Sequence, residues 1–455
     1  MYSRKNFLFT ILIFVLLGGM IIPAPLFQVV RAAMDNAPAA DNSVSVVVQF
    51  STTDRLIRKV SFSSSTITGL DALLNSGLEV VTADTPWGKA VCSIEGVGCP
   101  ADDCFCGGST SWNYEFWDGT AWQGHSSGAS STTLTDGAVD GWRWGEWGGQ
   151  SILPYPQLER AWKALQWLKN QQNSDGGYGS PSSAASSSVE SLLAIGANHH
   201  KASEWRQNIS TASILGYMMA NGSNFTKNSA SGAGKFAVGA SSTQLCFPFQ
   251  ARSPADYYDP ATGKYHPDAG PQAWAILGTL ALSQTVPADA VTYLKNLSLP
   301  TGGWEWSDGW TADTNTTALA IQALVGAGVD PGDPVIVSGL NFIKSAQNND
   351  GGFTYDPDST WGTDSDANST AYVLQAIYAV GQDPTSAAWQ EGGKTAIDFL
   401  ATVQLADGSL EWQPSLGSNL LATQQAIPAL LGRPAPFAIR AVEACKVSFL
   451  PTISR

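Results

Sequence analysis

Two short phrases recur along the C-terminal two thirds of the chain, and such internal repeats constrain the fold more than any other sequence feature. The first phrase is a helix-forming segment followed by a glycine turn. It occurs at 164–168 before 175–178, 290–294 before 302–304, 339–343 before 350–353, and 396–400 before 407–408. The glycines predict helix stops, because the chain must pass through positive φ to reverse there.

The second phrase is a short helix with a polar start and an almost wholly apolar body. Its clearest copies are 313–324 (DTNTTALAIQAL) and 366–377 (DANSTAYVLQAI), and weaker copies begin near Ser187, Ser231, Gly270 and Asn419. Polar side chains at a helix start bind the free N–H groups of the first turn. A helix that is apolar nearly all round must be buried on every side.

Six buried helices, each preceded by a helix with one apolar face, describe an inner ring inside an outer ring. The copies recur about every 40 to 53 residues, a spacing typical of repeat architectures. We therefore predict a closed (α/α)6 toroid of six helix pairs over residues 157–432. An open solenoid is the alternative geometry, and six copies favour closure. The third outer helix is the weakest, because residues 246–263 carry three prolines and little periodicity.

The segment before the repeats reads as β-rich. Val44, Val46 and Val48 alternate with polar residues, and other strands are indicated at 55–62, 90–94, 112–117 and 141–144, with one short helix at 69–78. These patterns predict a small α+β domain over residues 42–145. Residues 146–156 are interpreted as a linker, and residues 433–455 as a C-terminal tail.

Residues 1–33 have the layout of a secretory signal peptide. Arg4 and Lys5 precede an apolar run at 7–22, which leads to the small residues Ala32 and Ala33. The run is shorter than the roughly 18 to 20 residues of a spanning helix, although a retained anchor that associates with the membrane is the alternative. We expect a secreted or cell-surface protein.

Four of the six cysteines, Cys92, Cys99, Cys104 and Cys106, lie in one short stretch. In an exported chain this clustering indicates a disulfide-tied loop, whose pairing the spacing leaves open. A zinc site is the competing interpretation, but the paired CxxC knuckles of such sites are missing. The net charge of −14 argues against a nucleic-acid partner.

The starts of the inner helices and the glycine turns converge on one mouth of the predicted ring. Aromatic rings beside carboxylates and amides suit a large, partly flat small-molecule ligand with polar edges. The alternative is that the aromatics pack the repeats and the acids cap helices. The predicted ligand-binding residues are Tyr178, Trp304, Trp306, Asp313, Thr316, Gln322, Tyr355, Trp361, Asp364, Asp366, Gln375, Glu411, Trp412 and Gln425.

Catalytic and metal-binding motifs are scarce. No HExxH, GxSxG, P-loop or GxGxxG pattern stands in a fitting context. Residues 364–367 (DSDA) approach the DxDD acid motif of class II terpene cyclases but lack its last Asp, so Asp366 is interpreted as a helix cap. The sequence thus predicts no catalytic residue and no metal site, and it favours binding over catalysis.

The repeats over about 157–432 resemble the prenyltransferase and squalene-cyclase repeat, which builds (α/α)6 toroids. Within that superfamily, residues 316–324 (TTALAIQAL) and 419–431 (NLLATQQAIPALL) are most similar to transcobalamin and intrinsic factor. Residues 43–145 are similar to the small β-rich domain of those carriers, notably at 68–74 (TGLDALL) and 112–114 (WNY).

This resemblance implies an exported carrier that clamps cobalamin, or a corrinoid-like ligand, between toroid and β domain, with no other cofactor required. Here the β domain precedes the toroid, whereas in the carriers it follows, so a clamp requires the linker to fold over the mouth. The alternative from another class is an exported toroid enzyme of terpene-cyclase-like or glycan-active type, with rim carboxylates as acid and base. A third hypothesis is an adhesion or envelope-structural module.

Overall fold

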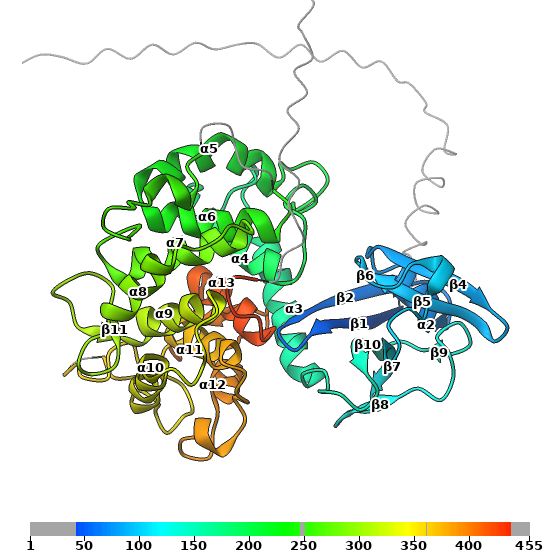
Figure 1. Ribbon diagram of the computed structural model, residues 1–455. Helices are drawn as coiled ribbons and strands as arrows, with labels where there is room; N and C mark the ends of the chain where they lie inside the picture. The colour runs from blue at the N-terminus through cyan, green and yellow to red at the C-terminus, as the bar shows by residue number, and fades with distance from the viewer. Residues whose placement is uncertain (1–41, 246–250, 361, 438–455) are drawn as a thin grey trace, which may run out of the picture.

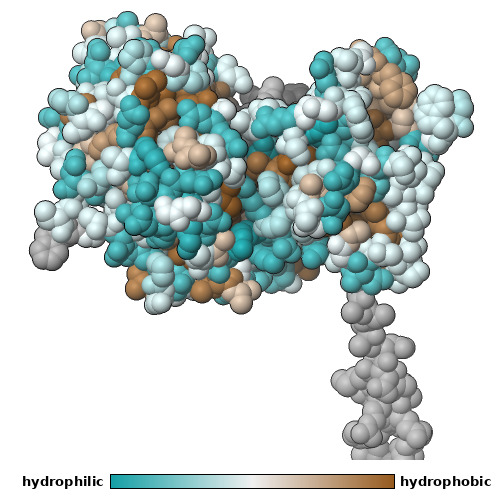
Figure 2. All heavy atoms as spheres, turned by 90° about the horizontal axis from the view of Figure 1, so that it is seen from below, coloured by the Kyte–Doolittle hydropathy of each residue, from teal (hydrophilic) through white to brown (hydrophobic). Residues whose placement is uncertain are grey.

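The computed structural model describes residues 42–245, 251–360 and 362–437, which form a β-rich region followed by a ring of helices (Figure 1). The two parts lie side by side as separate lobes, and hydrophilic residues are spread over both in the view from below (Figure 2). The predicted combination of an N-terminal β-rich region and a helical toroid is confirmed.

The β-rich region is built on a five-stranded sheet with the order β2-β1-β10-β7-β8. Strand β1 pairs with β10 in parallel, and the other neighbours are antiparallel. Alternate residues of β1, including Val44 and Val46, pack with Leu70 and Leu73 of helix α2. The strands of the sheet are β1 (Asn42–Ser51), β2 (Asp54–Phe62), β7 (Thr110–Trp117), β8 (Trp122–Gly124) and β10 (Val139–Glu146).

Smaller elements complete this region. They are β3 (Ile67–Thr68) paired with β9 (Thr133–Leu134), α2 (Gly69–Leu74), the small sheet of β4 (Val80–Thr85), β5 (Gly88–Ile94) and β6 (Val97–Gly98), and the 3-10 turn η1 (Ala101–Asp103). The expected helix at 69–78 is shorter than predicted, because Asn75 caps it.

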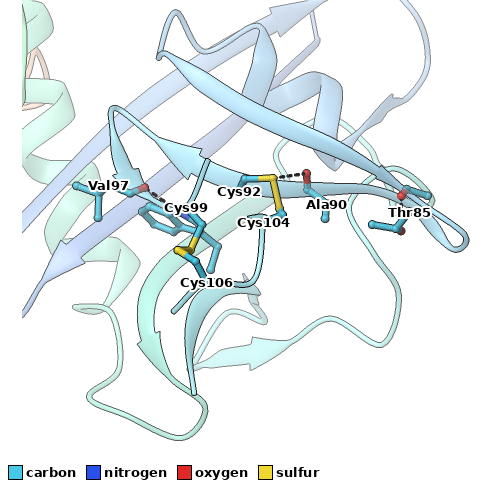
Figure 3. Close-up of a disulfide and its surroundings, with 9 residues drawn as sticks. Thr85, Ala90, Cys92, Val97, Cys99, Cys104 and Cys106 are labelled. Carbon is cyan, nitrogen blue, oxygen red and sulfur yellow. Dashed lines mark hydrogen bonds between the residues drawn. A yellow bond between two sulfur atoms is a disulfide. The ribbon is translucent and has the colours of Figure 1, made fainter. Parts of the chain in front are cut away.

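Two disulfides tie the loop that follows β5, joining Cys92 to Cys104 and Cys99 to Cys106 (Figure 3). The prediction of disulfides is confirmed, and the structure supplies the pairing that spacing alone left open. Disulfides persist in oxidising compartments and are therefore compatible with secretion. Within the described ranges, none of the helices combines the length and apolar character needed to cross a membrane.

The inner ring consists of six helices that pack in sequence order. The last, α13, packs on the first, α4, so the ring is closed and the solenoid alternative is wrong. The inner helices are α4 (Ala185–Ala197), α6 (Ala230–Ser242), α7 (Ala269–Ala281), α9 (Thr314–Gly326), α11 (Ala367–Ala379) and α13 (Leu420–Leu430).

The outer layer departs from the predicted six pairs. In the described part of the chain it contains α3 (Tyr155–Asn170), α5 (Ile214–Asn228), α8 (Ala288–Asn296), α10 (Pro334–Ser345) and α12 (Ala396–Thr402). The third outer position holds only the 3-10 turn η2 (Pro254–Tyr257), beside residues 246–250, which lie outside the described residues. Proline cannot donate a helical hydrogen bond, and Pro254 and Pro260 account for the absence of an α-helix over the described residues 251–268.

Short pairings join the outer helices to the inner ones at the mouth. They are β11 (Trp304–Glu305) with β12 (Ala312–Asp313), and β13 (Leu410–Glu411) with β14 (Ser418–Asn419); the 3-10 turn η3 (Ala387–Trp389) precedes α12. The glycine turns behave as predicted. Gly351 has φ +85°, and a Cβ there would meet the carbonyl oxygen of Thr395 at 2.3 Å.

The β-rich region docks on the C-terminal ends of the inner helices. Nη1 of Arg55 donates to the carbonyls of Leu431 (2.7 Å) and Gly432 (3.1 Å) beyond α13, and Nη1 of Arg58 donates to the carbonyl of Asn198 (2.9 Å) beyond α4. Free carbonyls at helix C-termini carry partial negative charge, which favours these guanidinium groups. The β-rich region therefore lies at the end of the ring opposite the inner-helix N-termini.

Candidate functional site

A cavity of about 350 Å³ opens at the N-terminal ends of the inner helices. Its wall combines aromatic rings, hydroxyl and amide groups, two carboxyl groups and one ammonium group. The lining residues are Lys235, Trp274, Trp306, Asp313, Asn315, Thr316, Leu319, Tyr355, Asp366, Asn368, Ser369, Tyr372, Trp412, Leu421 and Gln425. This composition is typical of a small-molecule site, with an apolar wall and a few directed polar groups.

Asp313 is the N-cap of α9 and is almost completely buried, with 1% of its surface exposed. One carboxylate oxygen accepts the N–H of Thr316 at 2.7 Å, and the other accepts the hydroxyl of Thr316 at 2.8 Å. Burial raises the pKa of Asp313 to about 6, against the hydrogen bonds from Thr316 and Tyr355, which lower it. The carboxyl group therefore carries a proton in mildly acidic solution.

Asp366 repeats this arrangement one repeat later, as the N-cap of α11. Its carboxylate accepts the N–H of Ser369 at 2.8 Å and the hydroxyl of Ser369 at 2.7 Å. Burial raises the pKa of Asp366, while the hydrogen bonds from Ser369 and the Trp412 side chain lower it. The predicted capping role is thus correct, but the cap also faces the cavity.

Lys235 of α6 and Glu190 of α4 form an ion pair in the wall of the ring. The Lys235 Nζ lies 4.9 Å from the centre of the Trp274 ring, a cation–π contact. Burial lowers the pKa of Lys235, but the Glu190 carboxylate outweighs this effect, and the net direction is upward. The ammonium group therefore stays charged and is neutralised by Glu190.

Two polar atoms of the cavity wall lack a hydrogen-bond partner among the described residues: Nε1 of Trp274 and Oδ1 of Asn315. Trp274 is 3% exposed, so its indole N–H is a donor held in a nearly dry wall. Buried polar groups are usually satisfied, and orphans in a pocket wall call for a ligand or water.

A second, much smaller space of about 20 Å³ lies deeper in the ring, toward the C-terminal ends of the inner helices. The two spaces share Trp274, Leu319, Tyr372 and Gln425 as wall residues. The other residues of the narrow part are Glu190, Leu193, Gln322, Gln375, Gln424, Pro428, Ala435 and Phe437. We refer to the two spaces as the upper and the lower cavity.

Nine of the predicted ligand-binding residues line these cavities. Trp306, Asp313, Thr316, Tyr355, Asp366, Trp412 and Gln425 line the upper cavity, and Gln322, Gln375 and again Gln425 line the lower one. These residues could be predicted from the helix-cap and inner-helix patterns, because equivalent residues of successive repeats face the axis of the ring.

Three other predicted residues, Tyr178, Trp304 and Glu411, lie outside both cavities and make contacts within the repeats. Nε1 of the buried Trp304 donates to a backbone carbonyl of α8, and the buried Tyr178 hydroxyl accepts a hydrogen bond from a tryptophan N–H. The Glu411 carboxylate accepts backbone N–H groups of its own loop, and Asp364 is exposed. Trp361 lies outside the described residues.

Sequence reasoning missed Glu190, Lys235, Trp274 and Tyr372, because it looked at loops and caps rather than at helix bodies. A signal existed for two of them. Glu190 and Lys235 are the only charged residues of α4 and α6, whose other residues are small or apolar. A lone charge in a buried helix requires a partner, and each of these two meets the other.

Residues 256–419 match a family model described as the squalene-hopene cyclase C-terminal domain. The match covers α7 to the start of α13, which includes Asp313 and Asp366. It supports the predicted cyclase-type toroid, whereas the resemblance of the N-terminal region to a transcobalamin β domain is not confirmed.

One curated relative, (+)-kolavenyl diphosphate synthase from Herpetosiphon aurantiacus, is 48% identical over 44 residues, which are 10% of this chain and 8% of that protein. The chain thus matches only a small part of this relative's length. The type II terpene cyclase MstE from Scytonema has 14% identity and a TM-score of 0.41, over 61% of this chain and 97% of that one. A wild-type glycosidase has 13% identity and a TM-score of 0.37, over 61% and 96%.

The prediction of cobalamin binding and transport is wrong. The family match is to a cyclase domain rather than to a cobalamin carrier. The clamp also required the β-rich region to close over the mouth, but Arg55 and Arg58 hold that region on the opposite end of the ring. The alternative of a toroid enzyme is the better-supported interpretation.

Proposed function

We propose that the chain is an exported enzyme that uses acid catalysis on a bulky, unsaturated, neutral substrate of terpenoid type, bound in the upper cavity. The observation that carries this proposal is a buried carboxyl group, Asp313, that lines a cavity with an aromatic wall. Burial raises its pKa to about 6, so part of the population holds a proton near neutral pH. Catalytic acids work best when their pKa lies near the working pH.

The reaction follows from the groups present. The Asp313 carboxyl transfers its proton to one carbon of a C=C bond, which forms a C–H bond, leaves a carbocation on the other carbon and leaves Asp313 as a carboxylate. Attack by a second C=C bond of the substrate closes a ring and moves the positive charge along the chain. The Asp366 carboxylate, which lines the same cavity, then takes a proton from a neighbouring carbon to give a neutral product, and proton exchange with solvent restores the protonated Asp313. The rings of Trp274, Trp306 and Tyr372 supply π-faces that stabilise a cation.

The charges of the wall favour a neutral substrate. The upper cavity contains one ammonium group, Lys235, and Glu190 already neutralises it. Asp313 and Asp366 add negative charge when they are ionised, so a diphosphate group would meet no free cation among the lining residues.

The test is product formation by the purified exported protein. Geranylgeraniol and squalene are incubated with the protein between pH 5 and pH 8, and products are followed by gas chromatography with mass spectrometry. We expect cyclised isomers from geranylgeraniol, with a rate that decreases as the pH rises above about 6 because Asp313 loses its proton.

The variant Asp313→Asn should lower the rate at least 100-fold, the usual scale of a lost general acid. Asp364→Asn, which changes an exposed carboxylate two residues from Asp366, is the matched control and should retain the wild-type rate. Absence of product at every pH, or an unchanged rate in Asp313→Asn, would contradict the proposal.

A glycan-active enzyme is the second candidate, and a specific observation favours it. Asp313 and Asp366 line one cavity, and the partly exposed rings of Tyr355 (41%) and Trp412 (43%) stand in its wall. Glycoside hydrolysis uses two carboxyl groups that face one substrate. Release of reducing ends from a panel of soluble polysaccharides, with loss in both Asp313→Asn and Asp366→Asn, would replace the first proposal by this one.

A further inference from the structure

The residues that follow α13 run across the end of the ring opposite the mouth. We call residues 433–437 the floor segment. The backbone N–H of Ala435 donates to Oε1 of Gln322 at 2.9 Å, and Pro436 approaches Gly326 at the end of α9. Phe437 is 3% exposed and lines the lower cavity together with Pro428. The floor segment therefore forms the bottom of the pocket.

The β-rich region holds the floor segment in place. Arg433 donates from Nη1 to the carbonyl of Ala197 at 2.8 Å, and its Nη2 lies 3.0 Å from the Asp54 carboxylate of β2. The guanidinium group also covers the ring of Phe437, 5.6 Å from its centre. Arg433, at the start of the floor segment, is thus held by the β-rich region and by α4, and it contacts the ring of Phe437 at the other end of the segment.

Arg55 of β2 fixes the turn from which the floor segment starts, through the carbonyls of Leu431 and Gly432. Gly432 has φ +63°, and a Cβ at this position would lie 2.3 Å from Nη1 of Arg55, so a side chain there would be strained and would displace the guanidinium group. Asp54 and Arg55, neighbours on β2, therefore both hold the start of the floor segment. Asp54 pairs with Arg433, and Arg55 binds the turn that precedes it.

We propose that the floor segment sets the length of the ligand that the pocket accepts, with Phe437 as the specificity-determining residue and the β-rich region as the support that positions it. The identity of the natural ligand rests on the proposed function, but the depth limit does not. This assigns to the β-rich region a role at the closed end of the pocket, in place of a role as a cover over the mouth.

The physical basis is the burial of apolar chain. Each additional methylene group buried in an apolar cavity raises affinity roughly fourfold, until the chain meets the bottom. The lower cavity, which Phe437 lines, is the space that the end of such a chain would reach. Removal of the phenyl ring should extend this space downward, and the affinity should then continue to rise for longer chains.

The test uses neutral n-alkanols of increasing chain length, which displace the neutral fluorophore Nile red from the purified protein. In the wild type we expect affinity to rise by roughly fourfold per methylene and then to level off at a limiting length. In Phe437→Ala the limiting length should increase, and in Phe437→Trp it should decrease. Arg55→Gln should also increase it or abolish it, because the start of the floor segment is released.

The matched control is Phe399→Ala, which removes the same ring from outer helix α12, where Phe399 is 1% exposed and lies outside both cavities. Circular dichroism establishes that each variant is folded, and Phe437→Leu replaces Phe437→Ala should the latter fail to fold. An unchanged limiting length in the folded Phe437 variants, an equal increase in Phe399→Ala, or no displacement by any alkanol would overturn the inference. The assay needs no turnover, so a protein that binds alkanols with the expected limit but makes no product would contradict the proposed function alone.

Discussion

At the residue scale, the opposite charges of Glu190 and Lys235 neutralise each other in the wall of the pocket. Both side chains lie inside the ring, and each is the counter-ion of the other. Removal of one partner from a buried pair leaves an uncompensated charge, which costs more than the pair contributes. The pair is therefore sensitive to single substitutions and tolerant of a matched double one.

We expect Lys235→Met to lower the free energy of unfolding by about 3–5 kcal/mol, because Glu190 remains buried without its cation. The double variant Lys235→Met with Glu190→Gln should recover most of this loss. Urea unfolding of the two single variants and the double variant measures the coupling. Strictly additive losses would contradict the pairing.

Asp313 makes stability depend on pH. Its pKa rises from 3.8 to about 6 on folding, so the folded state binds more protons than the unfolded state between these values. The contribution of Asp313 to stability should be greatest below about pH 4 and should decrease by roughly 3 kcal/mol as the pH rises through 6. The variant Asp313→Asn should lose this decrease, whereas Asp308→Asn, at an exposed carboxylate, should keep it. Urea unfolding at pH 4, 5, 6 and 7 provides the comparison.

At the element scale, the glycine turns and the polar caps could be predicted because their causes are local. A positive φ and a free first-turn N–H group depend on the residue itself and its neighbours. The third outer helix showed the limit of this reasoning, since the weak periodicity at 246–263 indicated a poor helix without indicating the turn η2 that replaces it.

Gly351 and Gly381 allow the cost of a positive φ to be measured separately from the cost of a steric clash. Gly351 (φ +85°) and Gly381 (φ +72°) both adopt positive φ, but only at Gly351 would a Cβ collide with a neighbouring backbone, at Thr395. Gly381→Ala should cost about 1–2 kcal/mol, the conformational term alone. Gly351→Ala should cost clearly more, as measured by thermal unfolding. Equal losses would show that the turn at Gly351 moves freely to relieve the contact.

At the scale of the whole molecule, the sequence predicted the ring of helices correctly. It did not predict that the β-rich region packs on the end of the ring opposite the mouth. The repeats identify six inner helices, whose closure follows from their number, whereas the docking of the β-rich region depends on three side chains, Asp54, Arg55 and Arg58, that meet helix ends far along the chain. No local pattern encodes such a meeting. The resemblance to cobalamin carriers then suggested the wrong face, and with it the wrong function.

Closure of the ring also has a consequence for how the chain folds. Gln424 of the last inner helix donates to the Ser187 carbonyl and to the Ser191 hydroxyl of the first, across more than two hundred residues of sequence. Contacts between segments so far apart in the sequence form slowly, because a long loop must be closed first. The seam between α4 and α13 therefore cannot form until the final repeat is available, and the first repeats must stay free of aggregation until then.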